Sequence, residues 1–329
     1  MELGDAWGRV ATDLRVSLTD RCNLRCSYCM PAEGLAWLPG EEVLTDDEVV
    51  RLVDIATRLL GVRAVRFTGG EPLVRRGLVP IIAATSALDQ RPEIAMTTNG
   101  LGLARTAPAL AAAGLDRINV SLDTIRPDTF ATITRRDRIA DVLEGLRAAQ
   151  HAGITPIKVN AVLLRGINDD QAPELLAWAM AEGHQLRFIE QMPLDAQHAW
   201  HREAMITADE TLTLLEKEHV LTPITEGRGA APAEEFLVDG GPATVGIIAS
   251  VTRPFCGACN RVRLTADGQV RNCLFARTES DLRTPLRDGA TDQELAALWV
   301  QAVLPKLPGH GIDDPAFLQP ARPMSAIGG

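Results

Sequence analysis

The stretch CNLRCSYCM, residues 22–30, places three cysteines within eight positions: Cys22, Cys26 and Cys29. It directly follows a β-type run, DLRVSLT (13–19). Structural zinc sites and iron–sulfur clusters are usually held by four protein ligands. The nearest histidine is His151, so no fourth ligand is evident nearby. Three thiolates can hold three irons of a [4Fe–4S] cluster, and the stretch therefore predicts a cluster whose fourth iron is open to a small molecule. A zinc site with one distant ligand is the alternative.

The composition of the chain excludes several classes of protein. With 329 residues, 46% of them hydrophobic, the chain can form one large domain or one domain with a smaller second one. It contains no apolar run of about 18 residues and does not begin with a signal-peptide pattern, so we expect a cytoplasmic protein without a membrane span. The net charge of −10 argues against a general nucleic-acid binder. The six cysteines form two triplets, which favours metal ligation over disulfides.

Short strand-like runs alternate with helical patterns over most of the chain. Thr45-Asp46-Asp47-Glu48 predicts a capped helix that ends at Gly61, and further helices are expected over about 137–152 and 172–182. The alternation predicts parallel βα units, and we expect an α/β fold, a partial (βα)6 TIM-type barrel. A doubly wound open sheet is the alternative. Small polar clusters end nearly every expected strand, which favours the barrel, because barrel active sites are built there. The expected strands are 13–19, 64–70, 93–100, 117–123, 155–164 and 185–193.

The character of the sequence changes near residue 221. We expect a barrel domain over 1–221 and a C-terminal α+β domain over 222–329, with the Pro-, Gly- and Ala-rich stretch 222–235 as a linker or exposed loop. A hairpin is expected around Asp267-Gly268. With a two-residue loop, Arg263 would face Asn272 and Val262 would face Cys273.

Two motifs in the N-terminal part are similar to those of the radical S-adenosylmethionine superfamily. These are Cys-x3-Cys-x-aromatic-Cys after the first strand, with the single tyrosine of the chain in the aromatic position, and FTGGEP (67–72) after the second. The resemblance implies a [4Fe–4S] cluster at the first triplet whose open iron binds S-adenosylmethionine. It also implies that the protein positions the resulting 5′-deoxyadenosyl radical. The residues that it places at the cofactor are Tyr28, Gly70, Ser121 and Met192.

A second triplet lies in FCGACNRVRLTADGQVRNCLF (255–275), at Cys256, Cys259 and Cys273. Two triplets, together with DRCNLRCSYCMP, RFTGGEPLVR, MTTNG, SLDT, KVNAVLLRGIND, RFIEQMP, CNRVRLTADG and a closing IGG, resemble the GTP 3′,8-cyclase family over nearly the whole chain. The resemblance implies a second [4Fe–4S] cluster at these cysteines. GTP would bind between the two clusters, with its guanine at the open iron of the second.

The same resemblance implies the reaction. The adenosyl radical abstracts the ribose 3′ hydrogen of GTP, and C3′ attacks guanine C8 to give (8S)-3′,8-cyclo-7,8-dihydroguanosine 5′-triphosphate, the first step of molybdenum cofactor biosynthesis. A triphosphate needs convergent cations, and guanidinium groups suit bidentate phosphate contacts. Arg261 and Arg263 alternate along one strand, so they are expected on the same face. The expected substrate contacts are Arg15, Arg66, Thr97, Lys158, Arg261, Val262 and Arg263.

Other readings predict different sites. A peptide-modifying radical maturase is the alternative enzyme, although such enzymes usually carry more C-terminal cysteines, and a redox or zinc scaffold is the non-enzymatic alternative. The segment with His198 and His201 is expected to be an exposed loop near the pocket. The resemblance places the closing Gly328 and Gly329 in the active-site cavity. It also implies a one-electron reductant and a downstream cyclic pyranopterin synthase, and leaves open a monomer or a homodimer.

Overall fold

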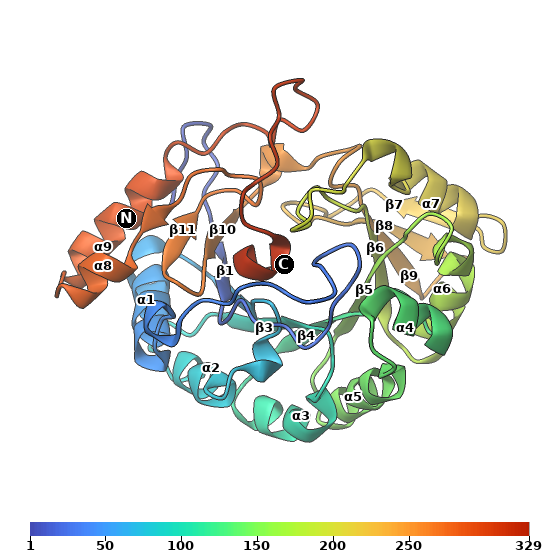
Figure 1. Ribbon diagram of the computed structural model, residues 1–329, viewed down its shortest axis with the longest axis horizontal. Coiled ribbons are helices and arrows are strands. Elements are labelled where there is room, and N and C mark those ends of the chain that lie inside the picture. Colours follow the sequence, from blue (N-terminus) through green and yellow to red (C-terminus); the bar gives the residue numbers. More distant parts are fainter. Residues whose placement is uncertain (329) are drawn as a thin grey trace.

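A single twelve-stranded sheet organises the molecule, as seen in the computed structural model, which describes residues 1–328 (Figure 1). The strand order is β12-β11-β10-β1-β2-β3-β4-β5-β6-β9-β8-β7. The strands are β1 Asp13–Ser17, β2 Ala64–Thr68, β3 Glu93–Thr98, β4 Arg117–Ser121, β5 Ile157–Val162, β6 Gln185–Ile189, β7 Leu221–Ile224, β8 Glu234–Val238, β9 Thr244–Ile248, β10 Arg261–Leu264, β11 Gln269–Arg271 and β12 Ser280–Asp281.

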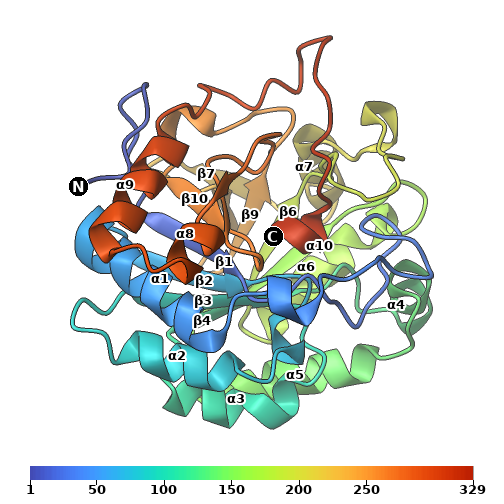
Figure 2. The same cartoon turned by 60° about the vertical axis from the view of Figure 1, so that its left-hand side comes forward.

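Helices cover the outer side of the sheet. In Figure 1 the helices from α1 to α6 lie around the outside of the curved sheet. The short helix α10, close to the C-terminus, lies on the inner side of that curve, and Figure 2 shows it labelled in a second view. The helices are α1 Asp46–Leu60, α2 Leu78–Ser86, α3 Leu103–Ala112, α4 Pro127–Thr134, α5 Ile139–His151, α6 Ala172–Ala181, α7 Ala208–Leu215, α8 Arg283–Arg287, α9 Asp292–Val303 and α10 Met324–Ile327. Among residues 1–328, no helix is long and apolar enough to cross a membrane.

The expected partial barrel is confirmed. All six expected strands form in order and pair in parallel, each with the next. The capping box at Thr45 and Glu48 begins α1, which ends at Gly61. Local sequence signals therefore fix these elements, and burial of their apolar faces against one another forms the main core.

The C-terminal part extends the barrel at both edges. β10 pairs in parallel with β1, and β9 pairs in parallel with β6. Eight neighbouring strands, from β10 to β9, therefore run parallel. Because both edges of the six-stranded unit are covered by later segments, the C-terminal part completes the wall of the barrel.

One local prediction was wrong, and another was only partly right. In the hairpin, Arg263 faces Arg271, not Asn272, because the loop has three residues between Thr265 and Gln269. Gly268 takes a positive φ of 78° there, as such three-residue hairpins require. The stretch 222–235 was expected to be a linker or an exposed loop: residues 225–233 do form a loop that is mostly exposed or half-buried, but the ends of the stretch belong to β7 and β8, which pair antiparallel.

The edge pairing predicts that the barrel segment is not stable alone. We expect a fragment of residues 1–221 to aggregate, because it leaves both β1 and β6 as long parallel edges without partners. Size-exclusion chromatography and thermal unfolding of the cluster-free fragment, next to the cluster-free full chain, check this. A monomeric fragment with a cooperative transition would contradict it.

Candidate functional site

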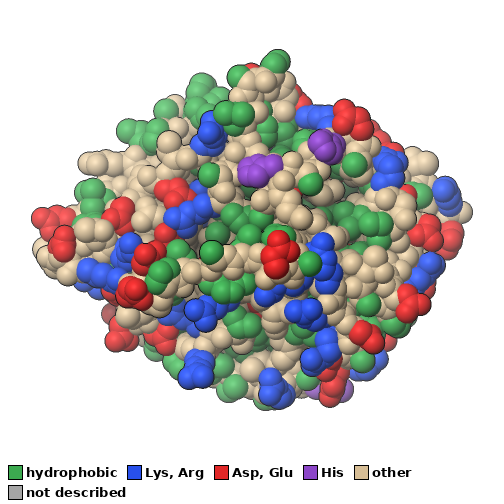
Figure 3. Space-filling view, viewed as in Figure 1, with side chains coloured by type: hydrophobic (Ala, Val, Ile, Leu, Met, Phe, Trp, Pro, Cys, Tyr) green, Lys and Arg blue, Asp and Glu red, His purple; other side chains and the backbone are tan. Residues whose placement is uncertain are grey.

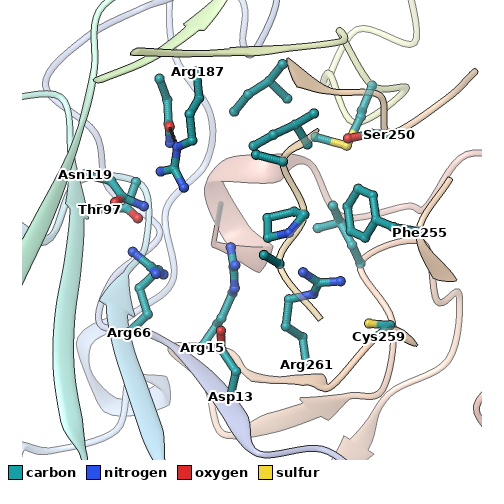
Figure 4. Close-up of a pocket in the computed structure, with 18 of the residues that line it drawn as sticks. Asp13, Arg15, Arg66, Thr97, Asn119, Arg187, Ser250, Phe255, Cys259 and Arg261 are labelled. Carbon is teal, nitrogen blue, oxygen red and sulfur yellow. Dashed lines mark hydrogen bonds between the residues drawn. The ribbon is translucent and has the colours of Figure 1, made fainter. Parts of the chain in front are cut away.

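One cavity of about 740 Å³ runs inside the barrel from the N-terminal ends of the strands to their C-terminal ends. Tyr28 and Met192 line one end of it. Asp13 and Phe255, labelled in Figure 4, line the other. All three cysteines of the second triplet also line it. The cavity therefore connects the loop of the first triplet with the second triplet.

Basic side chains dominate the charge of this cavity. Its lining includes seven basic residues, Arg15, Arg66, Arg117, Lys158, Arg187, Arg261 and Arg263, and four acidic ones, Asp13, Glu93, Asp123 and Glu235. Arg117 pairs with Glu93. The remaining excess of positive charge is typical of a site for a polyanion.

Strand register places three of these arginines in one row. Arg263 on β10 lies opposite Arg15 on β1, and Arg15 lies opposite Arg66 on β2. Paired residues point to the same face of a sheet, and neighbouring strands are about 4.8 Å apart. Figure 4 shows the tips of Arg15 and Arg66 converging in the cavity with that of Arg187.

Several donor nitrogens of these arginines lack hydrogen-bond partners in the described part of the protein. Arg66 is 5% exposed and Arg263 is 6% exposed. Within residues 1–328, Nε of Arg15 and both Nε and Nη1 of Arg66 have no hydrogen-bond partner. Burial, followed by the charge of Arg15, lowers the pKa of Arg66 and of Arg263 well below the usual value. These donors and charges suit an anion that is not part of the chain.

A second polar row crosses the neighbouring strands. Thr97 lies opposite Asn119, which lies opposite Lys158. Further along, Arg187 donates from Nε to Oδ1 of Asn160 at 3.0 Å. Burial, with the nearby charge of Arg15, lowers the pKa of Arg187 to about 10. Neither Arg187 nor Asn119 was predicted from the sequence, although a polar side chain inside an otherwise apolar strand was a signal that could have found them.

The loop of the first triplet is fixed by main-chain bonds to the end of α4. Arg25 N donates to Thr134 O at 3.1 Å, and Ser27 N to Ile133 O at 2.8 Å. The guanidinium of Arg135 donates to the carbonyls of Arg25 and Met30. The loop is therefore held in place by the protein itself.

The thiols of this loop are neighbours in a buried setting. Burial first, and then the charges of Asp123 and the other two cysteines, raise the pKa of Cys26 well above its usual value. Burial and the charge of Cys22 raise that of Cys29 to about 12. Among the described residues, no three Cys, His, Asp or Glu side chains are arranged to hold a single metal ion. Three thiols that interact electrostatically are instead the ligand type of an iron–sulfur cluster, whose iron replaces the thiol protons.

The Gly-Gly-Glu turn after β2 packs on the backbone that leads into this loop. Gly70 N donates to Thr19 O at 2.7 Å, and a Cβ at Gly70 would overlap the carbonyls of Asp20 and Arg21. Gly70 is not among the residues that line the cavity. The close approach explains why glycine is needed there, whatever the turn binds.

Glu71 is a buried carboxylate in the same turn. It accepts hydrogen bonds from Thr98 Oγ1 at 2.6 Å, Asn99 N at 2.6 Å and Leu73 N at 2.9 Å. Asn99 in turn lies 3.8 Å from Cys22 Sγ, measured from Nδ2. Burial raises the pKa of Glu71 from 4.5 to about 7 despite these bonds. Glu71 therefore connects β3 with the loop of the first triplet.

Three of the four expected cofactor contacts line the cavity together: Tyr28, Ser121 and Met192. The Tyr28 hydroxyl donates to Oδ2 of Asp123 at 2.9 Å, and Val162 N donates to Oδ1. Burial raises the pKa of Asp123 to about 6. Asp123 was not predicted as a site residue, and the structure adds it to this end of the cavity.

The second triplet is assembled by the hairpin and the turn before it. Cys256 and Cys259 lie in and just after a 3-10 turn, Cys256–Ala258, and Cys273 follows β11. Burial, with the charges of Cys273 and Cys259, raises the pKa of Cys256. Burial alone would also raise that of Cys259, but the cations of Arg261 and Lys306 lower it to about 7.

The C-terminal segment reaches the arginine row. Ser17 Oγ donates to the carbonyl of Ile327 at 2.8 Å, and Arg263 Nη1 donates to the carbonyl of Gly328. Met324 lines the cavity. Gly329, which was also expected in the cavity, lies outside the described residues.

Other expected residues lie elsewhere. Val262 is 1% exposed and belongs to the main core, so its side chain is on the opposite face of β10 from Arg263. His198 and His201 are exposed, as expected of that loop. On the face seen in Figure 3, Lys and Arg side chains lie around the region where the N-terminal loop and the C-terminal segment meet in Figure 1.

Comparison with protein families divides the chain into two matched segments. The Radical SAM superfamily model matches residues 16–179, and the Molybdenum Cofactor Synthesis C model matches residues 184–312. A GTP 3′,8-cyclase of Streptomyces coelicolor is 66% identical over 99% of this chain and 96% of its own length. A GTP 3′,8-cyclase of Mycolicibacterium smegmatis is 60% identical over 99% of this chain and 92% of its own.

Solved structures confirm the fold. Streptococcus suis SuiB superposes with a TM-score of 0.61 at 14% identity, covering 92% of this chain and 68% of that one. The same protein bound to S-adenosylmethionine superposes with a TM-score of 0.60 at 13% identity, covering 89% and 64%. At these identities the likeness is one of fold.

The burial of Glu71 predicts a pH dependence of stability. The unfolded chain loses this proton near pH 4.5 and the folded chain near pH 7, so the parent loses stability as pH rises between them. Glu71→Gln has no such proton, and we expect its free energy of unfolding to gain about 3 kcal/mol on the parent over that range. Denaturant unfolding of both cluster-free proteins at pH 4.5 and 7.5 checks this. A difference that stays constant with pH would contradict it.

Proposed function

The chain belongs to the GTP 3′,8-cyclase family of radical S-adenosylmethionine enzymes, and we propose that its arginine row, Arg263, Arg15 and Arg66, binds the triphosphate of GTP. The observation that carries the proposal is the register of β10, β1 and β2, which gathers the buried guanidinium groups of Arg263 and Arg66 on one face with that of the half-buried Arg15 between them. Arg66 keeps two nitrogens without partners in the described chain. A triphosphate supplies the acceptors and the negative charge that these groups need.

The family's chemistry requires two [4Fe–4S] clusters and S-adenosylmethionine, and the thiols of this chain fit both clusters. Cys22, Cys26 and Cys29 would hold one, and Cys256, Cys259 and Cys273 the other. When bound, the first cluster and S-adenosylmethionine supply the radical that starts 3′,8-cyclisation of GTP, the first step of molybdenum cofactor biosynthesis.

The protein's own part is to hold the substrate between the two triplets. Tyr28, Ser121 and Met192 form the cofactor end of the cavity, and the Gly70 turn packs outside it on the backbone that leads into the loop of the first triplet. Thr97 and Lys158 belong to the second polar row, which crosses β3 to β5 two residues closer to the C-terminal ends of the strands, and Arg187 adds a further cation from β6. Arg261 lies over the ring of Phe255, 4.8 Å from its centroid, at the end next to the second triplet.

This layout orients the nucleotide. The phosphates at the arginine row and the base beside Cys256, Cys259 and Cys273 leave the ribose facing the cofactor end. Apolar side chains in the wall of the cavity, including Ile248, Leu274 and Phe275, exclude water. A dry, enclosed site limits side reactions of a radical. Val262 joins the proposed contacts through its backbone, since its side chain is in the core.

Further parts of the proposal concern the setting of the enzyme. They are a cytoplasmic location, a one-electron reductant, and a downstream cyclic pyranopterin synthase that takes the product. We also propose functional units at 1–221 and 222–329, in a monomer or a homodimer that binds neither membrane nor nucleic acid. The relatives at 60–66% identity are cyclases, which argues against a peptide maturase and a zinc scaffold.

The arginine row predicts a trade-off between stability and binding. Arg66→Met removes one of three neighbouring cations, so we expect it to stabilise the ligand-free protein by about 1 kcal/mol. It also removes a charged donor to phosphate, so GTP should bind 10- to 100-fold more weakly, a loss of about 1.5–3 kcal/mol. Denaturant unfolding and calorimetric titration of GTP measure the two effects.

Arg63→Met is the matched control, since Arg63 is exposed just before the same strand. Arg63→Met should change neither the free energy of unfolding nor the affinity for GTP. Unchanged GTP affinity in Arg66→Met would remove Arg66 from the triphosphate site.

Replacing one thiol in each triplet should separate two losses. Cys26→Ala is expected to abolish S-adenosylmethionine cleavage, because its loop forms the cofactor end. Cys259→Ala should lose the cyclised product while some cleavage remains, because it lies at the substrate end. Anaerobic assays of 5′-deoxyadenosine and of a cyclised GTP isomer, which has the same mass as GTP and is separated from it by chromatography, check both. Equal 5′-deoxyadenosine formation in the two variants, or cyclised product from either of them, would contradict this division.

A further inference from the structure

A buried lysine lies against the second thiol triplet. Lys306 follows α9 and is 4% exposed. Its Nζ donates to Cys259 Sγ at 3.4 Å and to the carbonyl of Arg261 at 2.9 Å. Lys306 does not line the cavity, so its ammonium approaches the sulfur from the side away from the substrate space.

The segment that carries Lys306 is tied to the cysteine turn by Arg9. Arg9 donates from Nη1 to the carbonyl of Cys256 at 2.8 Å and from Nη2 to the carbonyl of Leu307 at 2.7 Å. Asp5 fixes the same guanidinium through Nε at 2.6 Å. Lys306 and the second triplet are therefore held in a defined relation by a third segment, from the N-terminus.

The choice of lysine is itself informative. Of the 33 basic residues only three are lysines: Lys158, Lys217 and Lys306. Lys217 is exposed, Lys158 lines the cavity, and Lys306 is buried at a thiol. In a chain that uses arginine almost everywhere, lysine at this position fits a need for a compact point charge that contacts one sulfur.

The surroundings of the six thiols differ in sign. Burial and neighbouring carboxylates or thiols raise the pKa of Cys22, Cys26, Cys29 and Cys256. The pKa of Cys259 is lowered instead, because the positive charges of Arg261 and Lys306 outweigh the effect of burial. One corner of the second triplet is therefore cationic.

We propose that Lys306 is a positioning residue of the second cluster, whose ammonium holds the Cys259 sulfur in place and raises the reduction potential of that cluster. The proposal rests on the proposed function in that it takes Cys256, Cys259 and Cys273 as cluster ligands. A positive charge and a hydrogen bond at a ligand sulfur stabilise the reduced, more negative form of a cluster. Lys306 provides both, and it does so without touching the substrate.

The test isolates the second cluster in the full chain. In a parent with Cys22, Cys26 and Cys29 all replaced by Ala, iron and acid-labile sulfide are counted, and the midpoint potential of the remaining cluster is measured by spectroscopically monitored redox titration. Lys306→Gln retains a neutral donor, and Lys306→Met retains none. Lys217→Met is the matched control, since it removes an exposed lysine.

We expect the midpoint potential to fall from parent to Lys306→Gln and further to Lys306→Met, with Lys217→Met equal to the parent. Loss of iron in Lys306→Met, with unchanged unfolding of the cluster-free protein, would also support the proposal. Should Lys306→Met not fold, Lys306→Gln decides. A folded, iron-loaded Lys306→Gln or Lys306→Met at the parent's potential would overturn the proposal while leaving the proposed function intact. A parent without iron and sulfide would overturn the second cluster and the proposal with it.

Discussion

Three arginines on adjacent strands, all pointing into one cavity, impose the main constraint on this molecule. Arg263, Arg15 and Arg66 are brought side by side by backbone pairing, which the side chains alone would oppose. Desolvation adds to the cost, because Arg66 and Arg263 are almost fully buried. The folded chain tolerates this arrangement through its large apolar core, which is continuous between the barrel strands and the C-terminal elements. A strained cationic row of this kind binds a polyanion strongly because the anion relieves repulsion as it forms new bonds.

The C-terminal part is therefore a component of the site and not an appendage to the barrel. It supplies one arginine of the row through β10, closes both edges of the parallel unit, and brings the second triplet to the cavity wall. It also supplies the segment whose Gly328 carbonyl accepts from Arg263. Because one segment makes these four contributions, the six βα units alone could not build the part of the cavity that the second triplet lines.

Sequence reasoning succeeded where the signals were local and failed where pairing was distant. The capping box at Thr45 and the alternation of strands and helices determine the barrel, because each depends on residues close in sequence. The pairing of β10 with β1 joins residues about 250 positions apart, and no local pattern encodes it. The hairpin was displaced by one residue because Thr265 Oγ1 accepts from Gln269 N and favours the longer loop. Site residues in motifs were predicted through a resemblance, whereas Arg187 and Lys306 belong to the site only through tertiary structure.

The two thiol triplets lie in opposite electrostatic surroundings. This difference affects how readily a cluster at each triplet gives up an electron. Near the first triplet the buried ionisable groups are carboxylates, Glu71 and Asp123, which disfavour additional negative charge. Near the second they are cations, Arg261 and Lys306, which favour it. A cluster among carboxylates gives up an electron more readily than the same cluster among cations. The first triplet thus lies in the more reducing environment and the second in the more electron-accepting one, and a single cavity borders both the loop of the first triplet and the second triplet.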